Sequence, residues 1–358
     1  MEEKRKPQAS IIVCCYNSTK RIIRTLEHIN QQKVRPGVCW ELIVVDNNSS
    51  DNTTQVVTDF LSDSSGIPSY KVVHEPNPGL SSARRKGVAE SSAEIVIYCD
   101  DDNWLDQNYV QNVLNIMNGD ESIGMLGGIG EAVTDSAAPE WFEANKASYA
   151  VGPQYEEEAD ITHQGGYVYG AGAALRKTPL LILDAIGFQH ALSDRIGNKM
   201  VSGGDNELGY ALALLNYKIY YSPKLAFKHY IPSNRLTKEH LSKFQVGQTY
   251  TFRAVRTYRN YMLNNHLLYE QPLFKKALQR VISSFKTFLK YLAGRSTYFD
   301  LYLHYKKTIS IVNYYYFWQK KDREIYLQVV NNINAINNYK LNQNNPVAIA
   351  SGAQGQKT

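Results

Sequence analysis

Three consecutive aspartates, Asp100, Asp101 and Asp102, directly follow the apolar stretch 94–99. The stretch predicts a buried strand, and ligands of open α/β sheets bind beyond the carboxyl ends of the strands. Carboxylates crowded at one point repel each other unless a cation balances them, and Mg²⁺ and Mn²⁺ bind such oxygens together with substrate phosphates. The run therefore indicates a metal and phosphate site. The alternative is a solvated acidic turn.

Asp46 is a second candidate, because it ends another apolar stretch, residues 41–45. A carboxylate at the end of a buried strand can accept hydrogen bonds from a nucleotide base or a ribose hydroxyl. Asp is also a common helix cap, so this position alone is weak support for a binding role.

Two further carboxylates, Asp205 and Glu207, follow the pair Gly203 and Gly204 at the predicted start of a helix. The helix dipole favours carboxylates in a first turn, so capping explains them as well as catalysis does. In the catalytic interpretation, one of them is the general base for an acceptor hydroxyl. His229, with Arg235 shortly after it, is a further candidate, although a single histidine is more often structural than a ligand.

The elements that position these residues follow from the hydrophobic periodicity. Short β-branched runs predict strands, and apolar residues three or four apart predict helices. Their alternation over the first 115 residues predicts an α/β fold with a mostly parallel sheet flanked by helices. The predicted strands are residues 10–15, 41–45, 70–74, 94–99, 124–130, 167–175 and 217–221, and the predicted helices are residues 19–32, 53–61, 81–89 and 206–215.

The charge of the chain is distributed unevenly. Residues 1–230 contain 20 Lys and Arg against 29 Asp and Glu, whereas residues 231–340 contain 18 against 5. We predict a catalytic domain over residues 1–236, a basic, aromatic-rich helical region over 237–340 and a disordered tail over 341–358. Residues 274–292 are basic and amphipathic, and the aromatic run 314–318 suits an interface, so the region is expected to contact an anionic membrane. The alternative is a helical bundle whose basic face packs on the acidic domain.

Taken together, the segments SIIVCCYNS (10–18), LIVVDNNSSD (42–51), EPNPGLSSARRKGV (75–88), IVIYCDDDNW (95–104), GGDNEL (203–208) and KHYIPSNRLT (228–237) resemble the family 2 glycosyltransferases of the GT-A fold, of the bacterial surface-polysaccharide type. The motifs occur in the order of the family and cover about residues 8–237. One departure is Gly204, where the family often has Glu.

The resemblance implies a role for each matching position in binding the donor. Tyr16 and Asn17 line the base pocket, Asp46 binds the nucleotide base, and Arg84 lies near the nucleotide.

In the DxD motif, Asp100 and Asp101 face the ribose and phosphates, and Asp102 holds the metal with help from His229. Asp205 is the catalytic base.

On the acceptor side, the resemblance implies Trp141 and Gly170, and Glu207 serves as a second candidate base.

The implied activity is metal-dependent, inverting transfer of a sugar from a nucleotide-diphosphate donor to an acceptor hydroxyl. The cofactor is Mn²⁺ or Mg²⁺, the donor a UDP-sugar before a GDP-sugar, and the acceptor a glycan or lipid-linked glycan of cell-surface polysaccharide or glycolipid synthesis. The expected location is cytoplasmic and peripheral on the inner face of the cell membrane, because no signal peptide or 18-residue apolar stretch is present.

Other functions fit the sequence less well. A dehydrogenase fingerprint GxGxxG and a P-loop are absent, CCYNSTK is not the phosphate loop of a nucleotidyltransferase, and no nucleic-acid module is present. A non-catalytic sugar-nucleotide-binding or scaffold protein with a degenerate domain is the alternative that the Gly204 departure supports.

Overall fold

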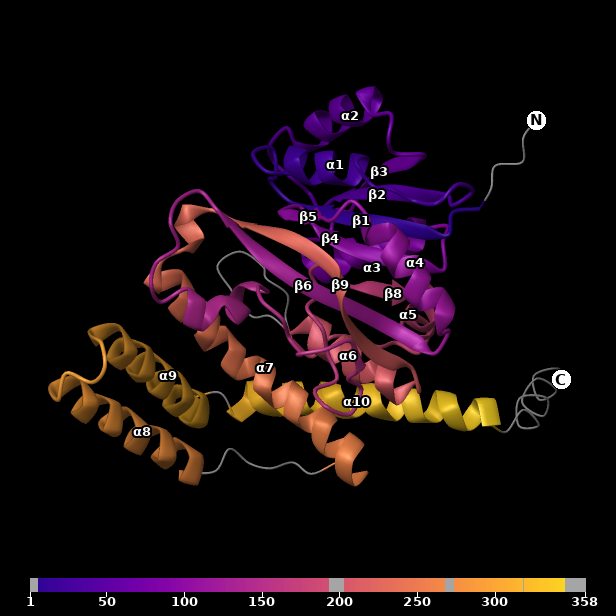
Figure 1. The fold of residues 1–358 in the computed structure, drawn as a ribbon. Coiled ribbons are helices and arrows are strands. Elements are labelled where there is room, and N and C mark those ends of the chain that lie inside the picture. The colour runs from indigo at the N-terminus through magenta and orange to yellow at the C-terminus, as the bar shows by residue number, and fades with distance from the viewer. Residues whose placement is uncertain (1–5, 193–202, 268–273, 318, 345–358) are drawn as a thin grey trace.

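The computed structural model describes residues 6–192, 203–267, 274–317 and 319–344. A single mixed sheet forms the centre, helices cover both of its faces, and a helical region follows it in the chain (Figure 1). The predicted fold class is therefore confirmed.

The first half of the sheet is parallel, as predicted. Its strands are β1 (Ala9–Cys15), β2 (Trp40–Asp46), β3 (Tyr70–His74) and β4 (Ile95–Asp100), in the order β3-β2-β1-β4. The connecting helices are α1 (Ile22–Asn30), α2 (Thr53–Asp63) and α3 (Leu80–Glu90).

Alternate residues of each strand enter two different hydrophobic cores, since side chains alternate across a sheet. Ile11 and Val13 of β1 pack with α1, α2 and α4 (Tyr109–Gly119) on one face. Ile12 packs with α3, α5 (Lys177–Ala185) and α6 (Gly204–Leu214) on the other. Because both faces are covered, β1, β2 and β4 are buried over nearly their whole length, whereas β3 at the edge is largely exposed.

The second half of the sheet is mixed and positions the later motifs. The sheet continues from β4 through β8 (Ala174–Arg176), β6 (Ile123–Thr134) and β9 (Lys218–Ile231) to β5 (Asn103–Leu105), and β7 (Ala159–Asp160) pairs with β9. Two short 3-10 helices, η1 (Glu143–Tyr149) and η2 (Ser233–Arg235), flank β9.

Two strand predictions in this half need correction. Residues 167–173 form a loop, and β8 covers only the end of the predicted strand 167–175. The loop is held by other contacts: Gly172 has a φ of 73°, and its carbonyl accepts a hydrogen bond from the Tyr109 hydroxyl at 2.6 Å. The strand predicted over 217–221 is much longer and continues to Ile231 as β9, which brings His229 to the carboxyl edge of the sheet.

The C-terminal helices divide into two pairs. α7 (Lys238–Asn264) and α10 (Gln319–Asn344) pack against α6 through a core that includes Tyr210, Tyr258 and Val329. α8 (Phe274–Leu292) and α9 (Tyr298–Phe317) form a hairpin that projects beyond them, at the lower left of Figure 1. The predicted tail beyond residue 344, Trp318 and the side chains of 314–317 lie outside the described residues.

Within the described part of the chain, every helix is too short or too polar to serve as a transmembrane span.

Candidate active site

The parallel strands end together at one edge of the sheet. In the strand register, Cys15 lies beside Asp46 and Cys14 beside Asp100, so the residues following β1, β2 and β4 meet there. A cleft of about 820 Å³ opens at this edge, and its lining includes Tyr16, Asp102, Asp205 and His229. The sheet thus gathers segments that are far apart in the sequence.

Each of the three consecutive aspartates faces a different arginine. Asp100 lies 3.3 Å from Arg84, Asp101 lies 2.8 Å from Arg21, and Asp102 lies 2.9 Å from Arg235. These distances are nitrogen to carboxylate oxygen. Because the three arginines come from α3, the residue before α1 and η2, the repulsion expected among the carboxylates is balanced by cations from three separate elements.

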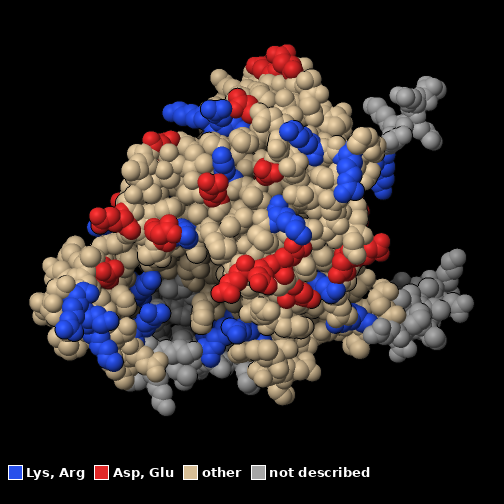
Figure 2. All heavy atoms as spheres, viewed as in Figure 1, with Lys and Arg blue, Asp and Glu red and all other residues tan. Residues whose placement is uncertain are grey.

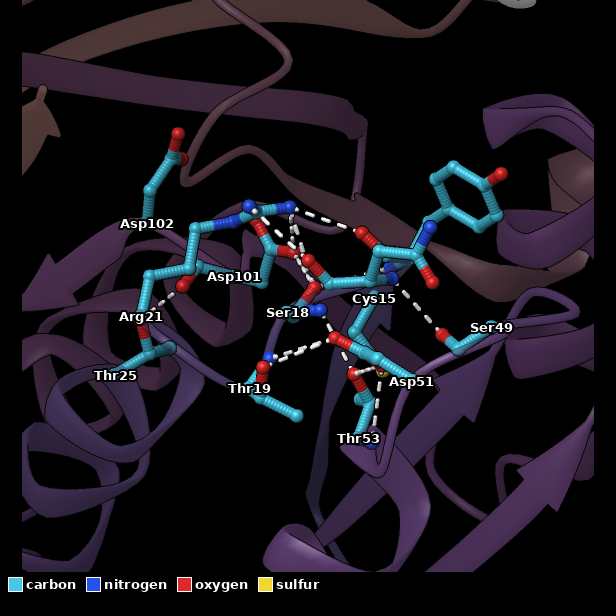
Figure 3. Close-up of polar contacts among 12 residues, drawn as sticks. Cys15, Ser18, Thr19, Arg21, Thr25, Ser49, Asp51, Thr53, Asp101 and Asp102 are labelled. Atoms are coloured by element: carbon cyan, nitrogen blue, oxygen red, sulfur yellow. Dashed lines mark hydrogen bonds and ion pairs between the residues drawn. The ribbon is translucent and has the colours of Figure 1, made fainter.

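Asp101 points into the protein. Its carboxylate accepts hydrogen bonds from Arg21 and from the Ser18 hydroxyl, and Figure 3 shows both converging on it while Asp102 points away from them. Burial raises the pKa of Asp101 to about 6, although Arg21 and Ser18 favour the charged form. This carboxylate is thus committed to fixing the start of α1 against the end of β4.

Asp102 carries the opposite electrostatic bias. Burial would raise its pKa, but His229 and Arg235 outweigh that effect and hold the pKa well below the usual range. The carboxylate therefore stays charged at neutral pH and is available to a cation.

His229 is oriented as a metal-binding histidine would be. Its Nδ1 lies 2.6 Å from the carbonyl oxygen of Tyr149, and because a carbonyl only accepts, we assign the proton to Nδ1. Nε2 faces Asp102 Oδ2 at 3.5 Å, so in the protonated ring it carries a proton toward the carboxylate, and in the neutral ring it presents a lone pair. A metal ion could take the place of that proton between the two groups, and a backbone carbonyl that fixes the other ring nitrogen is typical of metal-binding histidines.

The two donors Asp102 and His229 fit a divalent metal whose other positions are filled by phosphate oxygens and water. Over the residues that the structure describes, no group of three or more His, Cys, Asp or Glu side chains is arranged to hold a metal. Asp102 and His229 would therefore leave the other positions of such a metal open to phosphate oxygens and water.

A second chain of contacts joins Asp100 to Asp205. Arg84 stacks 4.6 Å above the ring of Tyr98, contacts Asp100, and lies 3.5 Å from the carbonyl oxygen of Gly170. The amide of Gly170 donates to Asp205 Oδ2 at 3.0 Å. A Cβ at Gly170 would lie 3.1 Å from Arg84, so the absence of a side chain lets the guanidinium approach the loop.

Helix α6 aims Asp205 into the cleft. Gly203 precedes the helix with a φ of 131°, a conformation that side-chain-bearing residues rarely adopt. A Cβ there would also clash with Thr251 and Leu192. Asp205 Oδ1 accepts from the amide and side chain of Asn206, each at 3.0 Å, which leaves the carboxylate held at the helix start and facing Gly170.

Comparisons with known proteins agree with this arrangement. The model of glycosyl transferase family 2 matches residues 10–181, which contain β1 to β4 and the aspartate run. Residues 10–181 form a family 2 glycosyltransferase domain. Catalytic candidates beyond the match, Asp205 and His229, reach the same cleft through α6 and β9.

Relatives and solved structures support the family domain. EpsH of Bacillus subtilis, which carries the name of a glycosyltransferase, is 28% identical over 116 residues, 32% of each chain. Cholesterol galactosyltransferase of Borreliella burgdorferi is 27% identical over 117 residues, 33% of this chain and 31% of its own. The chain therefore spans about a third of the length of these curated relatives. The mannosyltransferase PcManGT of Pyrobaculum calidifontis, in complex with GDP-Man and Mn²⁺, shares the GT-A fold, with a TM-score of 0.52 at 14% identity over 92% of this chain and 88% of that one.

Of the residues expected to bind the donor nucleotide, Tyr16 lines the cleft, whereas Asn17 and Asp46 hold neighbouring loops in place. Tyr16 is 57% exposed and lines the cleft. Asn17 ties two loops together, since its Oδ1 accepts from the amide of Ser50 at 2.8 Å. Asp46 accepts from the amide of Ser49 and the hydroxyl of Thr54, so its carboxylate organises the turn before α2, and the neighbouring Asn47 and Asn48 line the cleft instead.

Two residues expected on the acceptor side lie away from the cleft in the structure. Glu207 is fully buried, and its carboxylate accepts from the amides of Ala191 and Leu192 at 3.1 Å each, so it organises the loop before α6. Trp141 packs on Phe299 of α9, with ring centroids 6.0 Å apart, and is part of the contact between η1 and the hairpin. Neither is among the cleft-lining residues.

Arg21 and Arg235 were not among the predicted site residues. Both line the cleft, and each pairs with one of the aspartates Asp101 and Asp102. The signal for Arg21 was its position at the start of the first predicted helix, close to the end of the first strand. For Arg235 it was its place six residues after His229.

Proposed function

We propose that this chain is a glycosyltransferase that moves a sugar from a nucleotide-diphosphate donor to an acceptor hydroxyl with inversion at the anomeric carbon. The observation that carries the proposal is the meeting of two kinds of carboxylate in one cleft: Asp102 beside His229 and Arg235, and Asp205 across the Arg84–Gly170 contact. The first set suits a diphosphate with a metal, and the second suits a proton acceptor.

Asp102 and His229 would hold the divalent ion, Mn²⁺ or Mg²⁺, which when bound supplies Lewis-acid stabilisation to the leaving diphosphate. Arg235 already lies 2.9 Å from Asp102, so its guanidinium is close enough to turn to a phosphate oxygen when a metal takes that carboxylate. Arginine pairs readily with phosphate through two parallel hydrogen bonds.

The transfer itself needs a base, because an alcohol hydroxyl has a pKa far above 7. In the proposed step, the acceptor oxygen bonds to the anomeric carbon while the bond from that carbon to the diphosphate oxygen breaks. The electron pair leaves with the nucleotide diphosphate, and the hydroxyl proton passes to Asp205. Attack opposite the leaving group inverts the anomeric centre. The two hydrogen bonds that Asp205 accepts from backbone amides fix its direction.

The donor is proposed to be a UDP-sugar and the acceptor a glycan or lipid-linked glycan of cell-surface polysaccharide or glycolipid synthesis. The acidic cleft domain over 1–236 would act in the cytoplasm, with the basic region 237–340 placed against the inner face of the membrane. Support comes from the charge difference between the two parts of the sequence. The GDP-Man in the mannosyltransferase with the shared fold makes GDP the second nucleotide to test.

Thermal unfolding with UDP, GDP, dTDP or CDP, each with and without Mn²⁺, tests the donor site. A nucleotide at 100 times its dissociation constant stabilises the folded state by about 2.7 kcal/mol. We expect a Mn²⁺-dependent shift with one nucleotide, lost in Asp102→Asn and retained in the exposed control Asp63→Asn. A folded sample that responds to none of the four would refute the enzyme proposal.

A further inference from the structure

In the α8–α9 hairpin, α8 turns hydroxyl-bearing side chains toward α9 and leaves its large apolar side chains exposed to solvent. Small hydroxyl side chains take part in the contact of α8 with α9: Ser284 Oγ lies 2.6 Å from Thr308 Oγ1 and 3.3 Å from the carbonyl oxygen of His304. Near the turn, Ser296 Oγ donates to the carbonyl of Thr287 at 3.3 Å, and the rings of Tyr291 and Tyr298 pack with centroids 6.4 Å apart. The described side of α8 that faces α9 thus includes hydroxyl groups beside one aromatic contact.

The outward face of α8 is apolar. With 3.6 residues per turn, positions spaced three, four and seven apart share one side of a helix. The large apolar side chains of α8 follow this spacing, and each is at least 40% exposed: Leu278, Val281, Ile282, Phe285, Phe288, Leu289 and Leu292. We call these seven residues the apolar face of α8. Soluble monomers rarely expose so large a contiguous apolar patch, and such patches mark sites of interaction with a protein or a membrane.

The charged residues of α8 indicate which kind of partner could cover its apolar face. α8 contains Lys275, Lys276, Arg280, Lys286 and Lys290 and no acidic residue. Arg280, Lys286 and Lys290 are exposed, and none of the three forms an ion pair with another described residue. Figure 2 shows Lys and Arg side chains gathered at the lower left, over α8 and α9. Arg280, Lys286 and Lys290 thus form no ion pair with the described part of the acidic catalytic domain, although Lys340 of α10 does contact it through Leu214 and Asn216.

We propose that the apolar face of α8 inserts into the surface of an anionic phospholipid membrane. A helix with a strong apolar side and a Lys- and Arg-rich remainder lies in the membrane interface, with its cations at the lipid headgroups. A second copy of the chain would bring two cationic helices together, which disfavours self-association. This inference deepens the membrane partner proposed above and does not depend on the transfer chemistry.

The base of the hairpin connects this surface to the cleft. Phe299 and Leu303 of α9 are buried against Phe142 and Tyr149 of the η1 segment. Tyr149 also lines the cleft, and its carbonyl accepts the hydrogen bond from His229. An α8 helix that lies on a membrane would therefore hold the cleft close to that membrane, where a lipid-linked acceptor would be presented.

Flotation of the full-length protein with vesicles tests the proposal. The probe is phosphatidylcholine alone, or phosphatidylcholine with phosphatidylglycerol, at low and high salt. We expect binding to the anionic vesicles that weakens with salt, and little binding to the neutral ones. Phe285→Glu should weaken it at least about tenfold, because a large apolar side chain is replaced by an anion. Lys286→Glu and Lys290→Glu should each weaken it at least about fivefold.

The matched control is Leu327→Glu, which places the same charge at an apolar side chain of α10 that is 46% exposed and outside the patch. Its vesicle binding should equal that of the wild type. Wild-type protein that stays unbound to anionic vesicles would overturn the proposal, and so would equal weakening by Phe285→Glu and Leu327→Glu, or a dimer in light scattering that Phe285→Glu converts to monomer. The nucleotide-dependent thermal shift, measured on the same samples, reports separately whether the donor site is intact.

Discussion

The charged residues of the cleft are paired with opposite charges, whereas those described on α8 are exposed to solvent. In the cleft, Asp100, Asp101 and Asp102 each have an arginine within 3.3 Å, so the anions are balanced inside the protein. On α8, Lys286 and Lys290 are exposed beside uncovered apolar side chains. The comparison teaches that the anions of the cleft are paired within the described protein, whereas the apolar face of α8 is left exposed there and is the surface that we propose a membrane covers.

The largest expected effect is a loss of turnover when Asp205, the proposed base in the cleft, is replaced. Asp205→Asn keeps the size of the side chain but removes the proton acceptor, so turnover should fall about 10²- to 10⁴-fold. Turnover is measured as release of the nucleotide diphosphate, with whichever donor passes the binding test. The thermal shift with nucleotide and Mn²⁺ should persist, and Asp63→Asn should match the wild type. Turnover of Asp205→Asn near that of Asp63→Asn would remove Asp205 as the base.

A large effect on stability is expected at the buried pair between α7 and α10. The guanidinium of Arg253 contacts both carboxylate oxygens of Asp322, with Nη2 to Oδ2 at 2.7 Å, and Asp322 is fully buried. Asp322→Asn would leave a buried cation without its counter-ion and should cost about 3–5 kcal/mol. Denaturant unfolding measures the loss, and hydrogen exchange should locate it in α7 and α10. Glu324→Gln, at an exposed neighbour on α10, is the control. Equal unfolding midpoints for the two variants would show that α7 and α10 do not depend on this pair.

Replacing Glu207 tests whether this carboxylate of α6 contributes to stability and not to turnover, in contrast to Asp205 on the same helix. Glu207→Gln gives two backbone amides a single carbonyl oxygen to share, so we expect a loss of about 1–3 kcal/mol in the free energy of unfolding. Turnover per folded molecule should be unchanged, in contrast to Asp205→Asn. A large fall in turnover without a loss of stability would instead return Glu207 to the list of candidate bases.

The smallest effect is expected at a surface pair far from both regions. Lys218 and Ser122 donate to the carboxylate of Asp120 and hold its pKa at about 2, below the ordinary value of 3.8. A lowered carboxylate pKa stabilises the folded state above the unfolded pKa, and this contribution is lost as the pH falls from about 4 toward 2. Because the pair is largely exposed, Asp120→Asn should cost less than about 1 kcal/mol at pH 7. The difference in melting temperature from the wild type should shrink between pH 5 and pH 3, and a constant difference would show that the ion pair is not its cause.

Much of the cleft was predictable because strand ends in a parallel sheet must meet at one edge. The position of Asp102 followed from that rule, whereas Asp205 in α6 and Arg84 in α3 were implied by the family resemblance alone. The direction of each side chain did not follow. Asp101 turns inward because Ser18 and Arg21 are fixed beside it by the first turn after β1, a contact between segments about 80 residues apart.

Prediction also failed where the chain is held by contacts from distant elements. The alternation of aromatic and small residues over 167–175 favours a strand, but the loop there is fixed by Tyr109 at Gly172 and by Asp205 at Gly170. Glu207 follows Asp205 by two positions, and such residues point to different sides of a helix. Only the packing of the Ala191 and Leu192 backbone shows which of the two carboxylates is buried.

The arginine beside each of the three consecutive aspartates has a consequence for how the protein folds. An acidic cluster without internal cations would need ions from solution to assemble, and its folding would then vary with the metal content of the cell. Here Arg21, Arg84 and Arg235 make the resting cleft nearly electroneutral. The described cleft is therefore balanced in charge without metal or nucleotide, and under the proposed function these ligands would be needed for turnover but not for folding.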